Sequence, residues 1–334
     1  MGFVKYVLII FKHVLQKVHQ ISIRYFYRMK NWIIFFVAII ANQNLFSQVS
    51  NPDLIYLKSI EDSMKVSSTA LRDELNLSER LTGDSLFTKQ LVRALKVNFS
   101  FTYPFDSLNT CSKLYSPDSN FRIVTWQLQV SEDQFKQRGV IQIRTNDGSM
   151  KIFPLIDKSD DIENIEKHVG SNQNWIGAIY YKIVLNKYND VPYYTLIGYD
   201  ENSIRSNRKI IEVLTFKDNN PVFGGSYFNV PNDEAKPSFP ARFIMEYKKG
   251  SGARLTYDEE LQVIVKEHLI SESNQPQRKW TLIGDGDYEG FKWSKGKWLY
   301  IEKIFDQITP EGKAPTPLPL RDKNGIFLKE SKKQ

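Results

Sequence analysis

The chain has 334 residues and a formal net charge of +7. Its first 48 residues contain six Lys or Arg and no Asp or Glu, so the remaining 286 residues carry a net charge of only +1. A near-neutral body has no field that attracts phosphates, which excludes a charge-driven nucleic-acid-binding protein, and a single cysteine, Cys111, excludes an internal disulfide.

Residues 1–48 have the features of a leader. Basic residues at 24–30 precede an unbroken apolar run of ten residues at 32–41, and the small residue Ser47 follows. This order predicts a signal peptide cleaved between Ser47 and Gln48. Ten helical residues span about 15 Å, roughly half the hydrocarbon thickness of a bilayer, which disfavours a transmembrane helix. We therefore expect a periplasmic or secreted protein whose membrane contact is through the leader alone; an uncleaved N-terminal anchor is the alternative.

Residues 1–28 have a pattern of their own. Apolar residues recur there at helical spacing between three lysines. One interpretation is a basic amphipathic helix at a membrane surface. The other, which we favour, is that translation starts at Met29 and that residues 1–28 come from a misassigned start codon.

Residues 49–99 are predicted to be helical. The first apolar stripe is formed by Leu54, Leu57, Ile60 and Met64, at spacings of three to four residues. Asp84 or Ser85 is expected to cap a second helix. The apolar face of that helix would contain Phe87, Leu91, Ala94 and Leu95. We expect both stripes to pack on the β domain that follows.

Residues 100–305 change to a period of two. Strands are expected at 121–130, 139–144, 150–156, 175–185, 193–199, 209–216, 242–247, 253–257, 262–269, 280–283, 290–293 and 297–304. A tight turn is expected at 146–149 and one short helix at 160–167. Most connections are shorter than the dozen residues that a parallel crossover needs, so the sheets are expected to be antiparallel.

The fold class predicted is therefore mainly β. It is an antiparallel meander in groups of three to four strands, arranged as a propeller or as stacked sheets, with an N-terminal helical segment; a β-sandwich is the alternative. Residues 306–334 contain closely spaced prolines and an excess of basic residues. Because proline cannot donate to a β-ladder, we expect a disordered, solvated tail there.

Several segments carry a family resemblance. They are 103–108, 116–126, Trp175-Ile-Gly-Ala-Ile-Tyr-Tyr181, 193–200 and Asp285-Gly-Asp-Tyr-Glu-Gly-Phe291. Together they resemble an uncharacterised group of exported proteins from Bacteroidota, over about residues 50–305. The resemblance implies export and brings no activity, ligand or site residue with it. Tyr199 stands where such proteins carry Trp in a Gly-Trp-Asp turn.

Two acidic clusters are candidates for chemistry. Asp258, Glu259 and Glu260 follow a strand and are candidate catalytic carboxylates, although they fit a charged turn equally well. Asp285, Asp287 and Glu289 surround a glycine and are candidate ligands of Ca²⁺, although a turn with solvated acidic side chains is the favoured interpretation. Their spacing does not match a helix-loop-helix calcium site. His168 and His268 are expected to make ordinary hydrogen bonds, because two histidines alone do not make a zinc site.

Aromatic residues are the remaining candidates. A platform for a carbohydrate or peptide ligand could include Tyr180, Tyr181, Tyr193, Tyr194 and Trp293, but packing in the core is the favoured interpretation of strand aromatics. Neighbours in a strand point to opposite faces, so each tyrosine pair either lies between two buried layers or displays one ring.

The function that these observations favour is an exported cell-envelope binding or interaction module. Its partner would be an envelope protein or a carbohydrate. The alternative is a carboxylate-dependent hydrolase of envelope or imported polymers, and the sequence leaves the presence of any catalytic activity open.

Overall fold

The structure is a computed structural model that describes residues 48–230 and 239–305. The leader up to Ser47 and the tail from residue 306 lie outside the described residues, so both stay predictions. The described residues form two long helices followed by three β-sheets, in which all strand pairs but one are antiparallel. This confirms the predicted mainly β, antiparallel fold with an N-terminal helical segment.

Helices α2 (Asn51–Asp73) and α3 (Leu77–Leu95) form a hairpin. The predicted cap at Asp84 or Ser85 is wrong, because both residues lie inside α3. The observed cap is Asn76, whose side chain accepts a backbone N–H from the first turn of α3 at 2.9 Å. Asp84 is instead buried and accepts the indole N–H of Trp126 at 2.9 Å.

The first sheet lies against this hairpin. Its order is β1 (Ser112–Tyr115), β2 (Phe121–Gln129), β3 (Phe135–Ile143), β4 (Lys151–Ile156). The helical stripes predicted from the sequence form the core here, and Leu57, Met64 and Phe87 are fully buried. They pack with Val124 and Trp126 of β2.

The middle sheet has six strands. Its order is β5 (Gly170–Ser171), β9 (Asn220–Phe223), β8 (Ser206–Lys217), β7 (Val191–Asp200), β6 (Ile179–Tyr188), and β11 (Arg242–Lys248) pairs with the free half of β8. Side chains of this sheet are buried on both faces. Leu196 and Ile210 pack toward the first sheet, whereas the adjacent Ile197 and Ile211 pack toward the last sheet.

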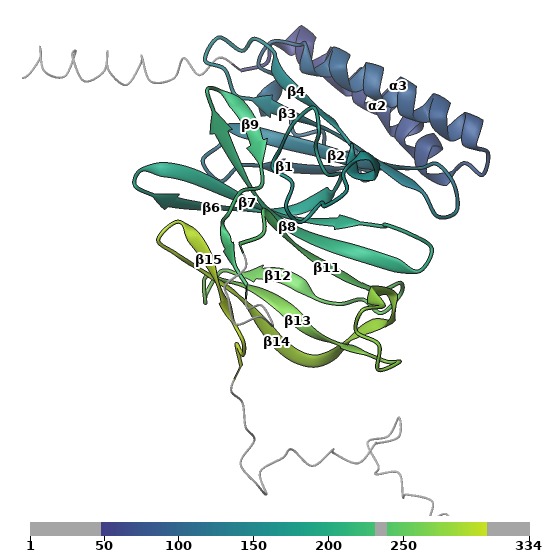
Figure 1. The fold of residues 1–334 in the computed structure, drawn as a ribbon. Helices are drawn as coiled ribbons and strands as arrows, with labels where there is room; N and C mark the ends of the chain where they lie inside the picture. The colour runs from purple at the N-terminus through teal and green to yellow at the C-terminus, as the bar shows by residue number, and fades with distance from the viewer. Residues whose placement is uncertain (1–47, 231–238, 306–334) are drawn as a thin grey trace, which may run out of the picture.

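The last sheet closes the stack. Its order is β10 (Phe228–Asn229), β15 (Lys297–Ile301), β14 (Leu282–Ser294), β13 (Val263–Ser271), β12 (Leu255–Asp258), with β10 and β15 parallel. Ile264, Phe291 and Trp298 turn inward to the third core cluster. Figure 1 shows the resulting order of helical hairpin, first sheet, middle sheet and last sheet. Of the arrangements predicted, stacked sheets is the one observed.

Two local predictions are wrong. The segment 160–167 forms no α-helix and contains only part of a single 3-10 turn, η2 (Ser159–Asp161), because the Asp157 carboxylate accepts the backbone N–H of Ser159 and bends the chain. The predicted strands 280–283 and 290–293 are one strand, β14, which runs through the expected turn with a register shift opposite His268.

Candidate functional site

The predicted catalytic carboxylates lie in the turn between β12 and β13. Asp258 Oδ1 accepts the backbone N–H groups of Glu260 and Leu261 at 3.0 and 2.9 Å. Glu259 is exposed and pairs with Lys182. Their observed roles are to close a turn and to form a surface ion pair, and none of the three lines the cavities described below.

The predicted metal ligands lie on β14 but do not converge. Asp285 Oδ2 is 2.7 Å from Nδ1 of His268, and Asp287 is exposed. Glu289 is 7% exposed and is engaged by Lys266 and Tyr300. Across residues 48–230 and 239–305, no group of three or more His, Cys, Asp or Glu side chains is placed to hold a metal ion.

The five predicted ligand-binding aromatics separate into three groups. Tyr180 and Tyr194 are buried and hydrogen-bonded to Glu212 and Asp118. Tyr181 is 39% exposed and donates its hydroxyl to the carbonyl of Leu255 at 2.9 Å. Tyr193 and Trp293, 100 residues apart in sequence, meet with ring centroids 5.5 Å apart, and Tyr227 packs on Tyr193 at the same distance. These rings mainly pack on one another where the middle and last sheets meet.

A charged cleft of about 670 Å³ opens elsewhere between these two sheets. One wall is the loop 163–166, the centre is residues 243–246 of β11, and the other wall is formed by β13 and β14. The side chains Arg208, Lys266, His268, Lys279 and Glu289 contribute to its lining. Titratable groups gathered in a cleft are the physical signature of a functional site, so this is the candidate site of the molecule.

Two ionisable side chains that line the charged cleft, Lys266 and Glu289, contact each other. Glu289 accepts Lys266 Nζ on one carboxylate oxygen and the Tyr300 hydroxyl on the other. Burial lowers the pKa of Lys266 to about 8 and raises that of Glu289 to about 7, because the charged forms lose water; repulsion from Glu302 adds to the rise at Glu289. The contact between Lys266 and Glu289 opposes both shifts by favouring the ionised pair. Both carboxylate oxygens of Glu289 already have hydrogen-bond partners, so the role of Glu289 is to fix the shape of the cleft.

Comparison of the chain with protein-family models, with curated proteins and with solved structures finds no match. The resemblance to exported proteins of Bacteroidota therefore stays a prediction. The function has to be argued from the geometry of this chain.

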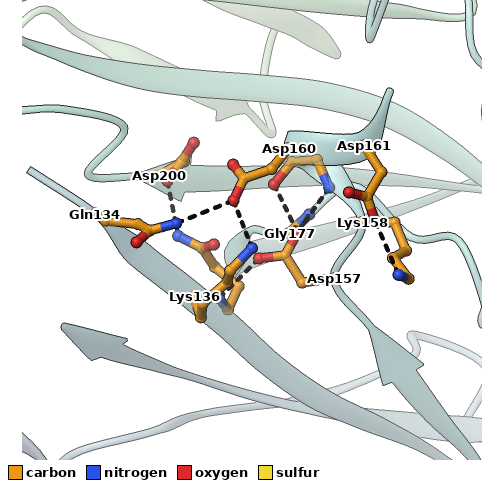
Figure 2. A network of polar contacts seen from close by, with 10 residues as sticks. Gln134, Lys136, Asp157, Lys158, Asp160, Asp161, Gly177 and Asp200 are labelled. Atoms are coloured by element: carbon orange, nitrogen blue, oxygen red, sulfur yellow. Dashed lines mark hydrogen bonds and ion pairs between the residues drawn. The ribbon is translucent and has the colours of Figure 1, made fainter. Parts of the chain in front are cut away.

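A polar network fixes the loop that forms the first wall of the charged cleft. The Asp157 carboxylate accepts the backbone N–H groups of Gln137, Ser159 and Gly177 at 3.0, 3.0 and 3.3 Å. The Gln137 amide donates to Asp200 Oδ1 at 2.7 Å, which links the first sheet to β7. Figure 2 shows this network together with the outer pairs of Asp160 with Lys136 and of Asp161 with Lys158. The chain therefore leaves β4 along a defined path toward residues 163–166.

Asp200 makes the network sensitive to pH. Burial, with the nearby charge of Asp157, raises the pKa of Asp200 to about 6 from an ordinary 3.8. A raised pKa means that the folded state binds the proton more tightly, so stability is lost as pH rises from about 4 to about 6. For this partly buried group the loss amounts to about 2 kcal/mol in the free energy of unfolding. Asp200→Asn is expected to abolish the part of the decline that Asp200 causes. Urea unfolding between pH 4 and pH 7 measures it.

Asp147 provides a control of opposite sign. Hydrogen bonds from the hydroxyl and the backbone N–H of Ser149 lower the pKa of this exposed carboxyl. Its contribution is therefore present above the unfolded pKa and lost as pH falls. Asp147→Asn should leave the decline between pH 4 and pH 6 in place. A decline of undiminished size in Asp200→Asn would show that another group causes it.

Proposed function

We propose that this chain is an exported, non-enzymatic binding module of the cell envelope, and that it holds an extended segment of a partner protein along the open edge of β11. The observation that carries the proposal is that four consecutive residues of an edge strand, 243–246, line the charged cleft. Side chains of a strand alternate between faces, so four successive residues border one cavity only where the cavity runs along the strand edge.

The pairing of β11 with β8 identifies which backbone groups face the charged cleft. Lys249 N donates to Arg205 O at 2.9 Å, one step beyond the register pair of Lys248 with Ser206. Bonded pairs alternate along an antiparallel ladder, so odd-numbered residues of β11 bond to β8 and even-numbered ones point outward. Ile244 and Glu246 therefore direct an N–H and a C=O each into the cleft. Within the described part of the chain, no strand pairs with that edge.

Exposed strand edges are templates for another chain. Proteins usually cover or interrupt such edges, and peptide-binding domains use them to add a strand from a partner. At the start of β11 the edge already has a partner other than β8, because the backbone N–H of Arg242 donates to the carbonyl of Glu166 at 3.3 Å. The cleft continues from that point toward Glu246.

Charges at the two ends of the edge specify the partner further. Glu163 and Glu166 line the end near Arg242, and neither forms an ion pair with any described residue. Lys279 lines the other end, where Lys248 pairs with Glu272 at 2.6 Å. Complementary charges favour a segment with a basic side chain near Arg242 and an acidic one near Lys248.

The proposed export of the protein rests on the predicted leader. The basic, apolar and small-residue order of residues 24–47 supports export. None of the helices in the described ranges is long and apolar enough to cross a membrane.

Amide exchange in the free protein is the first test. We expect the backbone N–H groups of Ile244 and Glu246 to exchange rapidly, and those of Phe243 and Met245, bonded to β8, to exchange slowly. Hydrogen–deuterium exchange read by NMR resolves the four positions. Slow exchange at all four would mean that the edge is covered, and would remove the basis of the proposal.

Peptides provide the second test. An array of random peptides of about ten residues supplies the probe, and the best binder is then N-methylated one amide at a time. Strand addition predicts that methylation weakens binding at every second amide only, because alternate amides face β11. Equal loss at all positions, or none, would contradict strand addition.

A charge reversal tests the predicted polarity. Glu163→Lys with Glu166→Lys should shift the array's preference from basic to acidic residues at one peptide end. Glu132→Lys, an exposed loop change that lies outside the charged cleft, is the matched control and should leave the preference unchanged. An unaltered preference in the double variant would place the peptide elsewhere.

A further inference from the structure

A second and larger cavity, which we call the hairpin cavity, has a volume of about 970 Å³. It is bordered by the start of α2, the loop 99–104 after α3, and the end of β3 with its following turn. Cavities of this size hold small organic ligands. None of its lining residues takes part in the charged cleft beside β11, so it is an independent site.

The apolar wall of the hairpin cavity is formed by rings and aliphatic side chains. Val49, Leu54 and Phe99 are partly buried and leave surface toward the cavity. Phe99 adopts a left-handed backbone conformation with φ 59° and is held by a hydrogen bond from its N–H to the carbonyl of Gly148 at 2.9 Å. Its ring lies so close to Gly148 that a Cβ there would be 2.6 Å from ring atoms. The ring of Phe99 is therefore held in a fixed place at the cavity wall.

One charged group lines the hairpin cavity. Arg144 is the single charged side chain among the described residues that line the cavity, and it is exposed and forms no ion pair within the described part of the chain. The nearby Gln142 is not available, because its amide accepts from Arg122 at 2.8 Å and donates to Ser100 at 3.1 Å. The guanidinium of Arg144 is therefore free to form charge-assisted hydrogen bonds with an anion.

We infer that the hairpin cavity binds an amphipathic organic anion. Its apolar body lies against Phe99, Leu54 and Val49, and its carboxylate or other anionic head accepts hydrogen bonds from Arg144. The hairpin cavity combines this apolar wall with polar side chains, among them Thr102, Asn120 and Thr145, which is the usual composition of a small-molecule site; the positive charge of Arg144 favours an anion.

Calorimetry with decanoate, below its micellar concentration, tests this inference on the full chain. Decanoate should bind, and decan-1-ol, with the same chain and no charge, should bind at least about tenfold more weakly, as expected for loss of a charged hydrogen bond. Arg144→Gln should weaken decanoate binding by a similar factor. Arg93→Gln, an exposed change that lies outside the cavity, should not. Asn146→Trp, at an exposed lining position, should narrow the cavity and weaken binding.

Each of three results would overturn the inference. They are no binding of decanoate, equal binding of decanol, and decanoate binding that Arg144→Gln leaves unchanged. Circular dichroism confirms that each variant is folded. Competition with the peptide that binds beside β11 separates the two sites, because decanoate bound in the hairpin cavity should not displace it.

Discussion

Arg242→Met is expected to lower the free energy of unfolding by about 3–5 kcal/mol, as is typical when one partner of a buried ion pair is removed. Arg242 and Glu212 are 1% and 0% exposed, and Arg242 Nε is 3.0 Å from Glu212 Oε2. Without the guanidinium, the carboxylate of Glu212 is left charged and unpaired in the core between the first and middle sheets. Urea unfolding followed by tryptophan fluorescence measures the loss.

The same change should weaken the proposed binding site. The Arg242 guanidinium also donates to the carbonyls of Ile165 and His168, the latter at 2.7 Å, which ties the loop 163–168 to β11. That loop is the wall of the charged cleft where Glu163 and Glu166 lie. We therefore expect Arg242→Met to reduce peptide binding beyond the fraction that unfolds.

Two further variants separate the ion pair from ordinary packing. Arg208→Met removes a pair on the same strands, with Glu246, whose side chains are 27% and 19% exposed, and should cost about 1 kcal/mol or less. Glu212→Gln combined with Arg242→Met should recover part of the loss, because neither charge then remains buried. Recovery is incomplete, since the carbonyls of Ile165 and His168 stay without their donor. A loss under about 1 kcal/mol for Arg242→Met would contradict this account.

The sequence predicts the layers of the fold where one period dominates. Leu57, Met64 and Phe87 lie at helical spacing and are buried, because a helix that covers a sheet has one apolar stripe. In the middle sheet the run from Thr195 to Ile197 is buried on both faces, as are Ile210 and Ile211. Such continuous runs indicate strands between two layers, but they do not indicate which layers.

Other features depend on contacts that the sequence does not reveal. The segment 160–167 has helix-forming residues, yet Asp157 reaches across to Gly177 and turns the chain. The segment 285–289 reads as a turn and is part of β14, because β13 pairs with it on both sides of a register shift. In each case a tertiary contact outweighs local preference.

The sequence does not predict the charged cleft, for a related reason. Lys266 follows three buried apolar residues of β13 and resembles the polar end of a strand. Its partner Glu289 belongs to an acidic cluster that resembles a metal site, and no pattern in the sequence marks Tyr300. Only the fold brings these side chains together. The open edge of β11 has no sequence signal either, because a strand edge is open when no other strand pairs with it, and the sequence of the strand does not show that.

Lys266→Met is expected to make stability strongly dependent on pH, with little or no cost at pH 5, where loss of the buried ammonium offsets loss of its contact, and a cost of about 3 kcal/mol at pH 7.5. Burial already raises the pKa of Glu289 to about 7 from an ordinary 4.5, so its contribution is complete below about pH 4.5 and is lost as pH rises through 7. Lys266 offsets that loss by pairing with the ionised carboxylate. Without it the pKa of Glu289 rises further, and the folded state must either hold a proton or bury an unpaired charge.

Two controls test whether Glu289 is the group responsible. Glu289→Gln in the Lys266→Met background leaves no acid to titrate there, so the extra loss between pH 5 and pH 7.5 should disappear. Lys182→Met breaks a surface pair with Glu259, whose side chains are 37% and 69% exposed, and should give no such pH-dependent loss. Parallel stability curves for Lys266→Met and the wild type would contradict the account. In Lys266→Met, Tyr300 still contacts the carboxyl group of Glu289. We therefore expect the charged cleft to keep its shape at pH 5 and to loosen at pH 7.5. The variant should bind peptide normally only at the lower pH.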